Sequence, residues 1–144
     1  GTKVGAMFGE AVVITNPLLN EDFRYLIKQH GAMLAKGWLL GLQFEALFED
    51  NLYFEISKHA VVLADKIRNT IDALGYSYLV AGTTNQVFPI LPDTLLAELE
   101  KNFTFCEQER VDAENRAVRF CTSWATTQEN VDKLCEALRK LVNR

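Results

Sequence analysis

The sequence predicts an α+β fold in which helices cover one face of a mostly antiparallel sheet. Three observations support this class. Residues 52–74 carry apolar side chains at helical spacing. Short β-branched and aromatic runs follow residue 75, and the short connections between them permit antiparallel pairs. The 144 residues are 49% hydrophobic and 24% charged, which is typical of a soluble globular domain of the commonest size.

The first third of the chain predicts one strand and two helices. Ala11–Ile14 is a short β-branched run and predicts a strand, which an Asn-Pro pair ends. A helix is expected from about Leu18 or Glu21 to His30, with acidic residues in its first turn and a glycine just after it. A loop then leads into a mostly apolar helix over residues 36–48.

A long amphipathic helix is expected to begin near Leu52 and to end at Gly75, the residue type that commonly closes helices. Its apolar stripe recurs at helical spacing and comprises Ile56, Ala60, Leu63, Ile67, Ile71 and Leu74. Tyr76–Val80 and Gln86–Leu91 then predict two strands joined by a polar turn. A short helix is expected to start at Pro92-Asp93 and to bury Leu95, Leu96 and Leu99.

The last third predicts two more strands and a final helix. The strands are Phe103–Glu107 and Ala117–Cys121, separated by the charged stretch Glu107–Arg116. Thr126–Glu129 has the pattern of a capping box for the last helix. That helix is expected to bury Val131, Leu134, Leu138 and Leu141.

Charge and composition exclude several function classes. Lys and Arg total 15 against 19 Asp and Glu, and the net charge of −4 argues against a nucleic-acid surface. No apolar run approaches the ~20 residues of a membrane span, and no signal peptide is visible, so a cytoplasmic protein without a membrane partner is expected. Three widely spaced cysteines, Cys106, Cys121 and Cys135, predict reduced, mostly buried thiols and no metal site.

Two basic residues are candidates for chemistry. Lys3 lies among small residues that would let a bulky ligand approach the backbone, where its amine could form a Schiff base. As a bare pattern, however, an isolated lysine of this kind is far more often a solvated surface residue. Arg119 falls inside an apolar strand, on the side of Ala117 and Cys121. A half-buried guanidinium needs a carboxylate, which either an internal ion pair or a ligand would supply.

Two further features leave alternatives open. Lys36 stands near the expected start of the second helix, where it could address an anion or simply face solvent. The aromatic residues Phe44, Phe48, Tyr53 and Phe54 fit either a core or an interface between protomers.

Four stretches together resemble a known family. Gly1–Ile14 is similar to the pyridoxal-phosphate lysine segment of threonine aldolases, which belong to the β-eliminating lyase group. Gly31–Gly37, Thr84–Pro92 and Val118–Thr126 continue the resemblance in order and without large gaps. Each stretch is loose by itself, but four in this order are specific, and the resemblance covers nearly all of the chain.

The resemblance implies a set of residue roles and the fold of aspartate-aminotransferase-type enzymes. Lys3 would be the Schiff-base lysine, and Thr2 would lie near the cofactor phosphate. Arg119 would bind the α-carboxylate of an amino acid substrate, for which a planar bidentate donor is suited. Lys36 matches a basic residue that approaches the cofactor from a loop, often across a subunit boundary. Val4 stands where asparagine is expected, a change that leaves the amine itself untouched.

The resemblance also implies a reaction, partners and a domain division. The reaction is cleavage of a threonine-type β-hydroxy amino acid to glycine and an aldehyde, with β-elimination, transamination or a non-catalytic interaction domain as alternatives. Residues 1–35 would end the cofactor domain, and residues 36–144 would form the carboxy-terminal small domain. Family members are well over twice this length, so the chain is expected to lack an amino-terminal half and to be inactive alone. A homodimer or homotetramer is expected.

Overall fold

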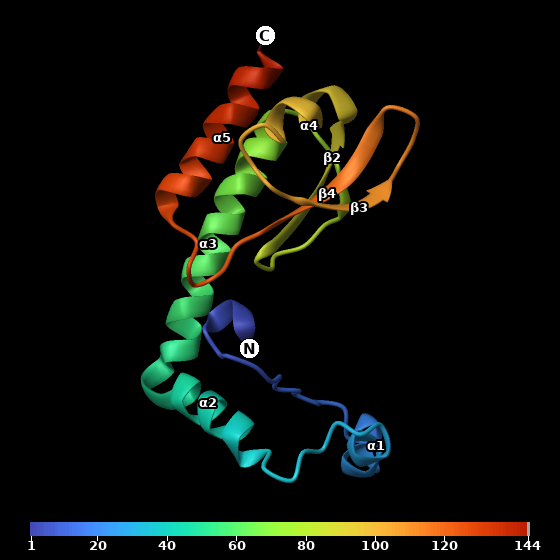
Figure 1. The fold of residues 1–144 in the computed structure, drawn as a ribbon, viewed down its shortest axis with the longest axis vertical. Helices are drawn as coiled ribbons and strands as arrows, with labels where there is room; N and C mark the ends of the chain where they lie inside the picture. The colour runs from blue at the N-terminus through green and yellow to red at the C-terminus, as the bar shows by residue number, and fades with distance from the viewer. Residues whose placement is uncertain (144) are drawn as a thin grey trace. The chain divides into compact units, whose positions relative to one another are not determined.

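A four-stranded antiparallel sheet with helices packed against it confirms the predicted α+β class. The structure, a computed structural model, describes residues 1–143 and divides into two units, Gly1–Glu55 and the residues from Ile56 onward (Figure 1). Within the described part of the chain, no helix has both the length and the apolar character needed to cross a membrane.

The sheet of the second unit has the strand order β1-β2-β4-β3, with every neighbouring pair antiparallel. The strands are β1 (Tyr78–Val80), β2 (Gln86–Pro92), β3 (Cys106–Arg110) and β4 (Asn115–Cys121). In the central pair Val87 lies opposite Phe120 and Ile90 lies opposite Ala117. Because side chains alternate along a strand, this register directs Val118 and Phe120 to the face that carries the core.

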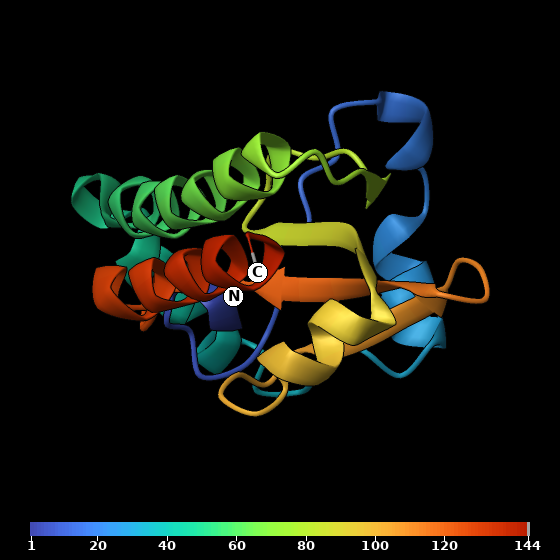
Figure 2. The ribbon, with the colours of Figure 1, turned by 90° about the horizontal axis from the view of Figure 1, so that it is seen from above.

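Three helices cover that face: α3 (Leu52–Ala73), α4 (Asp93–Leu99) and α5 (Gln128–Val142). Figure 2 shows α3 and α5 side by side, and the ion pair between Lys66 and Asp132 joins them. Most of their predicted apolar stripes are buried, whereas Ile56, Leu74 and Leu141 are half-buried. The core comprises Leu63, Ala64, Ile67, Ile71, Val87, Leu91, Leu95, Leu96, Leu99, Val118, Phe120, Val131, Leu134, Cys135 and Leu138.

Three local expectations in this unit were wrong in detail. The strand expected at 103–107 begins at Cys106, and Phe105 instead packs edge-on against Phe120 at 5.7 Å. The N-cap of α5 is Thr127, whose hydroxyl accepts the Asn130 N–H, so Thr126 and Glu129 form no capping box. The thiols of Cys106 and Cys121 are free but exposed, and only that of Cys135 is buried.

The charged stretch 107–116, expected to be a connection, forms most of a β-hairpin held by ion pairs. Arg116 donates to Asp93 at 2.6 Å and to Glu107 at 2.9 Å. Arg110 also pairs with Asp93, at 3.0 Å. These pairs tie the hairpin to the first turn of α4. An edge strand tolerates such charges because one of its sides is not paired.

Asp93 gives the second unit a measurable dependence on pH. Hydrogen bonds from Arg110 and then Arg116 hold the pKa of this carboxyl below its usual value. A carboxyl whose pKa is lowered by folding stabilises the protein when the pH is above its unfolded-state pKa of about 4. That stability is lost as the pH falls through the folded-state pKa. We therefore expect the melting temperature of Asp93→Asn to fall less than that of the unsubstituted chain when the pH is lowered from neutral to below the folded-state pKa of Asp93. Glu21→Gln, at an exposed position, is the control. An equal fall of the melting temperature in Asp93→Asn and in the unsubstituted chain would contradict this expectation.

The first unit is mainly helical. Its elements are η1 (Thr2–Val4), η2 (Pro17–Leu19), α1 (Phe23–Gln29), α2 (Trp38–Phe48), η3 (Glu49–Asn51) and the first residues of α3. The helix predicted at 36–48 is confirmed and begins at Trp38. The helix predicted from Leu18 or Glu21 to His30 is present but begins only at Phe23, so the acidic residues expected in its first turn precede it. The strand predicted at 11–14 is wrong, because these residues pair with no strand among those described, and Val12 and Val13 are exposed.

Candidate functional site

Lys3 lies on a tight turn at the start of the first unit. The N–H groups of Val4 and Ala6 both donate to the carbonyl of Gly1, at 3.1 Å each. Gly5 closes the turn in the left-handed conformation, with φ of 95°. Val4 and Ala6 are buried, whereas Thr2 and Lys3 are exposed. The Thr2 hydroxyl and the Lys3 amine are therefore both exposed, and neither forms a hydrogen bond or ion pair within residues 1–143.

The residues that follow this turn pack against α2. A Cβ added to Gly1 would come within 2.8 Å of the Gly9 carbonyl oxygen and 3.0 Å of the Phe44 ring. Gly9 has φ of 97° and lies against Leu40 and Phe44. The Gln43 side chain accepts the Met7 N–H at 2.7 Å and donates to the Phe8 carbonyl at 3.1 Å. Sequence reasoning missed Gln43, although an amide in a mostly apolar helix was a usable signal.

Lys36 is exposed two residues before α2 begins. No hydrogen bond or ion pair in the described part of the chain joins it to the turn that carries Thr2 and Lys3. Three of the four aromatic residues, at the end of α2 and the start of α3, form a cluster at the surface. Phe48 lies 4.9 Å from Tyr53 and 6.3 Å from Phe54, measured between ring centroids, and both phenylalanines are exposed.

Arg119 lies on β4 in the second unit, with Cys106 as its neighbour on β3. The side chain is half-buried and points away from the core face that Val118 and Phe120 occupy. Its guanidinium forms no ion pair or hydrogen bond with any residue from 1 to 143. The internal ion pair allowed by the sequence is therefore absent from the described residues. Arg116, three residues earlier, pairs with Asp93 and Glu107.

A set of hydrogen bonds around Thr122, hereafter the Thr122 network, holds the chain just after β4 and close to Arg119. The Thr122 hydroxyl, 2% exposed, donates to the Ala60 carbonyl at 2.7 Å. The Asn85 amide donates to the Thr122 carbonyl at 2.6 Å, and the Asn85 carbonyl accepts the Thr122 N–H at 3.0 Å. These bonds join α3, the 82–85 turn and β4, so they fix the backbone from which Arg119 projects.

Thr122→Val is expected to lower the free energy of unfolding by about 1–2 kcal/mol, the scale of one lost buried hydrogen bond. Valine has nearly the shape of threonine, so the loss reports the contacts of the hydroxyl with the Ala60 and Asn85 carbonyls rather than a cavity. Urea unfolding followed by circular dichroism measures it. Thr83→Val, at an exposed position without a side-chain hydrogen bond in the described structure, is the matched control. Equal free energies of unfolding for Thr122→Val and Thr83→Val would show that the hydroxyl of Thr122 does not stabilise the fold.

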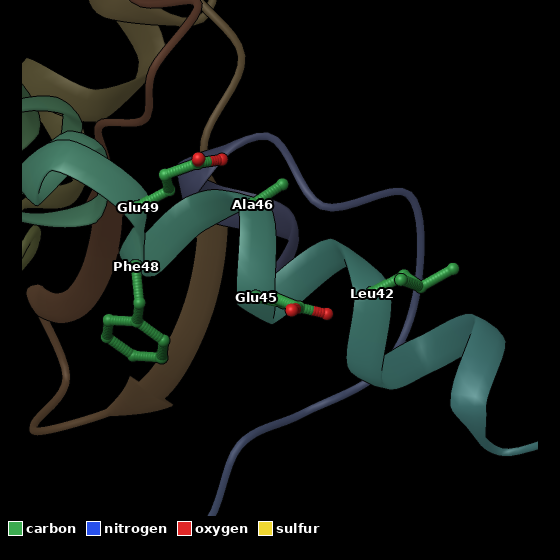
Figure 3. A pocket seen from close by; sticks show the side chains of 5 residues that line it. All are labelled: Leu42, Glu45, Ala46, Phe48 and Glu49. Atoms are coloured by element: carbon green, nitrogen blue, oxygen red, sulfur yellow. The ribbon is translucent and has the colours of Figure 1, made fainter.

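An open hollow on α2 includes none of the basic candidates Lys3, Lys36 and Arg119. Leu42, Glu45, Ala46, Phe48 and Glu49 line it, and Figure 3 shows two carboxylates among apolar side chains. Two carboxylates repel an anion, so this hollow is unsuited to a phosphate group.

A solved structure has the same fold. The structure of threonine aldolase from Leishmania major matches with a TM-score of 0.81 and 43% sequence identity, over 98% of this chain and 41% of that chain. The fold is therefore that of the carboxy-terminal region of a threonine aldolase. No family model matches the sequence.

Two curated bacterial relatives agree with this class. Low specificity L-threonine aldolase from Pseudomonas sp. is 28% identical over 99% of this chain and 41% of its own length. The enzyme of the same name from Pseudomonas aeruginosa is 28% identical over 96% of this chain and 40% of its own length. The chain is a homologue of the threonine aldolases and spans about two-fifths of the length of the relatives it matches.

Proposed function

We propose that this chain is the carboxy-terminal part of a pyridoxal-phosphate-dependent lyase that cleaves threonine-type β-hydroxy amino acids to glycine and an aldehyde. Two observations together support the proposal: the homology to threonine aldolases, and two basic side chains that have no partner in the described residues. Lys3 is an exposed amine on a fixed turn, and Arg119 is a half-buried guanidinium without a partner in the described residues. The homologous enzymes are named for this substrate.

The residues present fit the cofactor in their donor chemistry. The amine of Lys3 would hold the aldehyde carbon of pyridoxal phosphate, and the neighbouring Thr2 hydroxyl would donate to its phosphate. Lys36 would add a positive charge toward the same anion. When bound, pyridoxal phosphate supplies a conjugated ring that accepts an electron pair from the substrate. Residues 1–35 would belong to the cofactor domain and residues 36–144 to the small domain.

Arg119 would bind the substrate α-carboxylate. A guanidinium on a rigid strand forms two parallel hydrogen bonds to a carboxylate and thereby fixes the orientation of the amino acid. In the reaction the Cα–Cβ bond breaks, the β-hydroxyl loses its proton as it becomes the aldehyde carbonyl, and Cα gains a proton. Glycine and the aldehyde leave. Fixing the carboxylate selects which bond to Cα is placed to break.

The test is a chimera in which this chain replaces the matching part of the Leishmania major enzyme, hereafter the chimera. With pyridoxal phosphate and L-threonine, the chimera is expected to yield glycine and acetaldehyde in equal amounts. Ammonia with a 2-oxo acid would instead identify a β-eliminating lyase, and amino transfer to an added 2-oxo acid would identify a transaminase. The 144-residue chain alone is expected to give no turnover, because the rest of the enzyme and a second copy in a homodimer or homotetramer would complete the site.

A further inference from the structure

Gln43 is the residue that we propose positions Lys3. The inference rests on the proposed function of Lys3 as the cofactor lysine. Gln43 belongs to α2, and its side chain bonds to the backbone of Met7 and Phe8 rather than to Lys3. It is therefore a positioning residue, which acts through the segment that carries the amine.

The two hydrogen bonds of Gln43, hereafter the clamp, hold residues 7 and 8, which follow the turn that carries Lys3. The side-chain oxygen accepts the Met7 N–H at 2.7 Å, and the side-chain nitrogen donates to the Phe8 carbonyl at 3.1 Å. One amide thus satisfies a donor and an acceptor on neighbouring residues, as a partner strand would. These bonds span 36 and 35 residues of sequence, so they fix the segment to a helix far along the chain.

The side chains of the clamped residues do not provide this anchoring. Met7 is 83% exposed and Phe8 is 52% exposed, so neither contributes a buried apolar contact comparable to those of Val4 and Ala6. The anchoring of residues 7 and 8 therefore depends largely on Gln43. Without the clamp, the chain between Ala6 and Gly9 would be free to move away from α2.

The clamp affects Lys3 because the segment folds back on itself. Gly1, two residues before Lys3, lies so close to the Gly9 carbonyl that no Cβ fits between them. Both glycines also lie against Phe44, the residue after Gln43. Residues 7 and 8 lead directly to Gly9, so holding them holds the backbone against which Gly1 packs. The turn that carries Lys3 is thus fixed at both of its ends.

The experiment compares the chimera, in which the rest of the enzyme completes the site, with its Gln43→Leu, Gln43→Glu and Gln29→Leu variants. Gln29 ends α1 in the same unit, is exposed, and forms no side-chain hydrogen bond within the described chain, so it is the matched control. One readout is deuterium uptake by the peptide covering residues 1–9. The other is the share of pyridoxal phosphate that borohydride fixes on Lys3 relative to Lys28, measured by peptide mapping. Uptake by residues 56–143 reports whether each variant keeps its fold.

Gln43→Leu is expected to speed deuterium uptake in residues 1–9 and to lower the Lys3 share at least about fivefold, since small displacements of a reacting group strongly reduce its rate. Gln43→Glu keeps the acceptor for the Met7 N–H and loses the donor to Phe8, so it should fall between Gln43→Leu and the unsubstituted chimera. Gln29→Leu should change neither readout.

Two results would contradict different parts of the proposal, the positioning role of Gln43 or the function of Lys3. If the unsubstituted chimera favours Lys3 and Gln43→Leu keeps that preference, the positioning role is overturned while the function of Lys3 stands. If Lys3 reacts no faster than Lys28 in the unsubstituted chimera, the proposed function of Lys3 fails, and the positioning role fails with it.

Discussion

Replacing Lys3 with alanine is expected to abolish threonine cleavage by the chimera. The reason is that no other side chain on this turn is an amine, and the neighbouring Thr2 hydroxyl cannot hold an aldehyde carbon in its place. Removing a residue that bonds covalently in catalysis commonly lowers kcat by factors of about a thousand or far more, and we expect a loss of at least that size. Initial rates of acetaldehyde release measure the effect.

The control for this variant is Lys28→Ala, an exposed lysine of the same unit. Its kcat should match that of the unsubstituted chimera. Lys3→Arg keeps the positive charge but not a nucleophilic amine, so it should be as inactive as Lys3→Ala. A Lys3→Ala chimera that keeps more than a tenth of the activity would show that Lys3 is not the cofactor lysine.

Substitutions of Arg119 and Arg116 are expected to have different effects, the first on substrate binding and the second on stability. Arg119→Leu should lower kcat/KM for threonine between about 30-fold and about 5,000-fold, the equivalent of the roughly 2–5 kcal/mol that a truncated charge pair costs. Most of the change should appear in KM, because the lost contact binds substrate before the reaction. Thermal stability should be nearly unchanged, since Arg119 forms no ion pair within residues 1–143.

Arg116→Leu should have the opposite effects. It removes the ion pairs to Asp93 and Glu107 that join β4 to α4 and β3, so the melting temperature should fall while KM stays close to its original value. Arg119→Lys should lie between Arg119→Leu and the unsubstituted protein, because one ammonium cannot reproduce two parallel hydrogen bonds. If Arg119→Leu lowered stability and left KM unchanged, Arg119 would be a structural residue.

Local patterns predicted the helices well, because helical periodicity depends on residues only three or four apart. The stripe of α3 from Ala60 to Ile71 is buried as expected. Strands were predicted less well, because a strand needs a partner that the local sequence does not show. Ala11–Ile14 has strand propensity but no partner among the described residues, and β3 pairs three residues later than its aromatic pattern suggested.

The site residues came from resemblance rather than from pattern. Lys3 and Arg119 fit surface or ion-paired roles as isolated residues, and only the four ordered stretches favoured a cofactor and a substrate. The hydrogen bonds of Gln43 to Met7 and of Thr122 to Ala60 span 36 and 62 residues, so no window of the sequence reveals them. The structure therefore adds the positioning groups to the candidate catalytic residues.

The most direct test of the central claim is to locate pyridoxal phosphate in the active chimera. The chimera is saturated with the cofactor, reduced with borohydride, digested and mapped by mass spectrometry. We predict that the label lies on Lys3 and that threonine, added before borohydride, reduces the labelling. Label on a different lysine, or none in a folded chimera, would contradict the assignment of this chain to a pyridoxal-phosphate lyase.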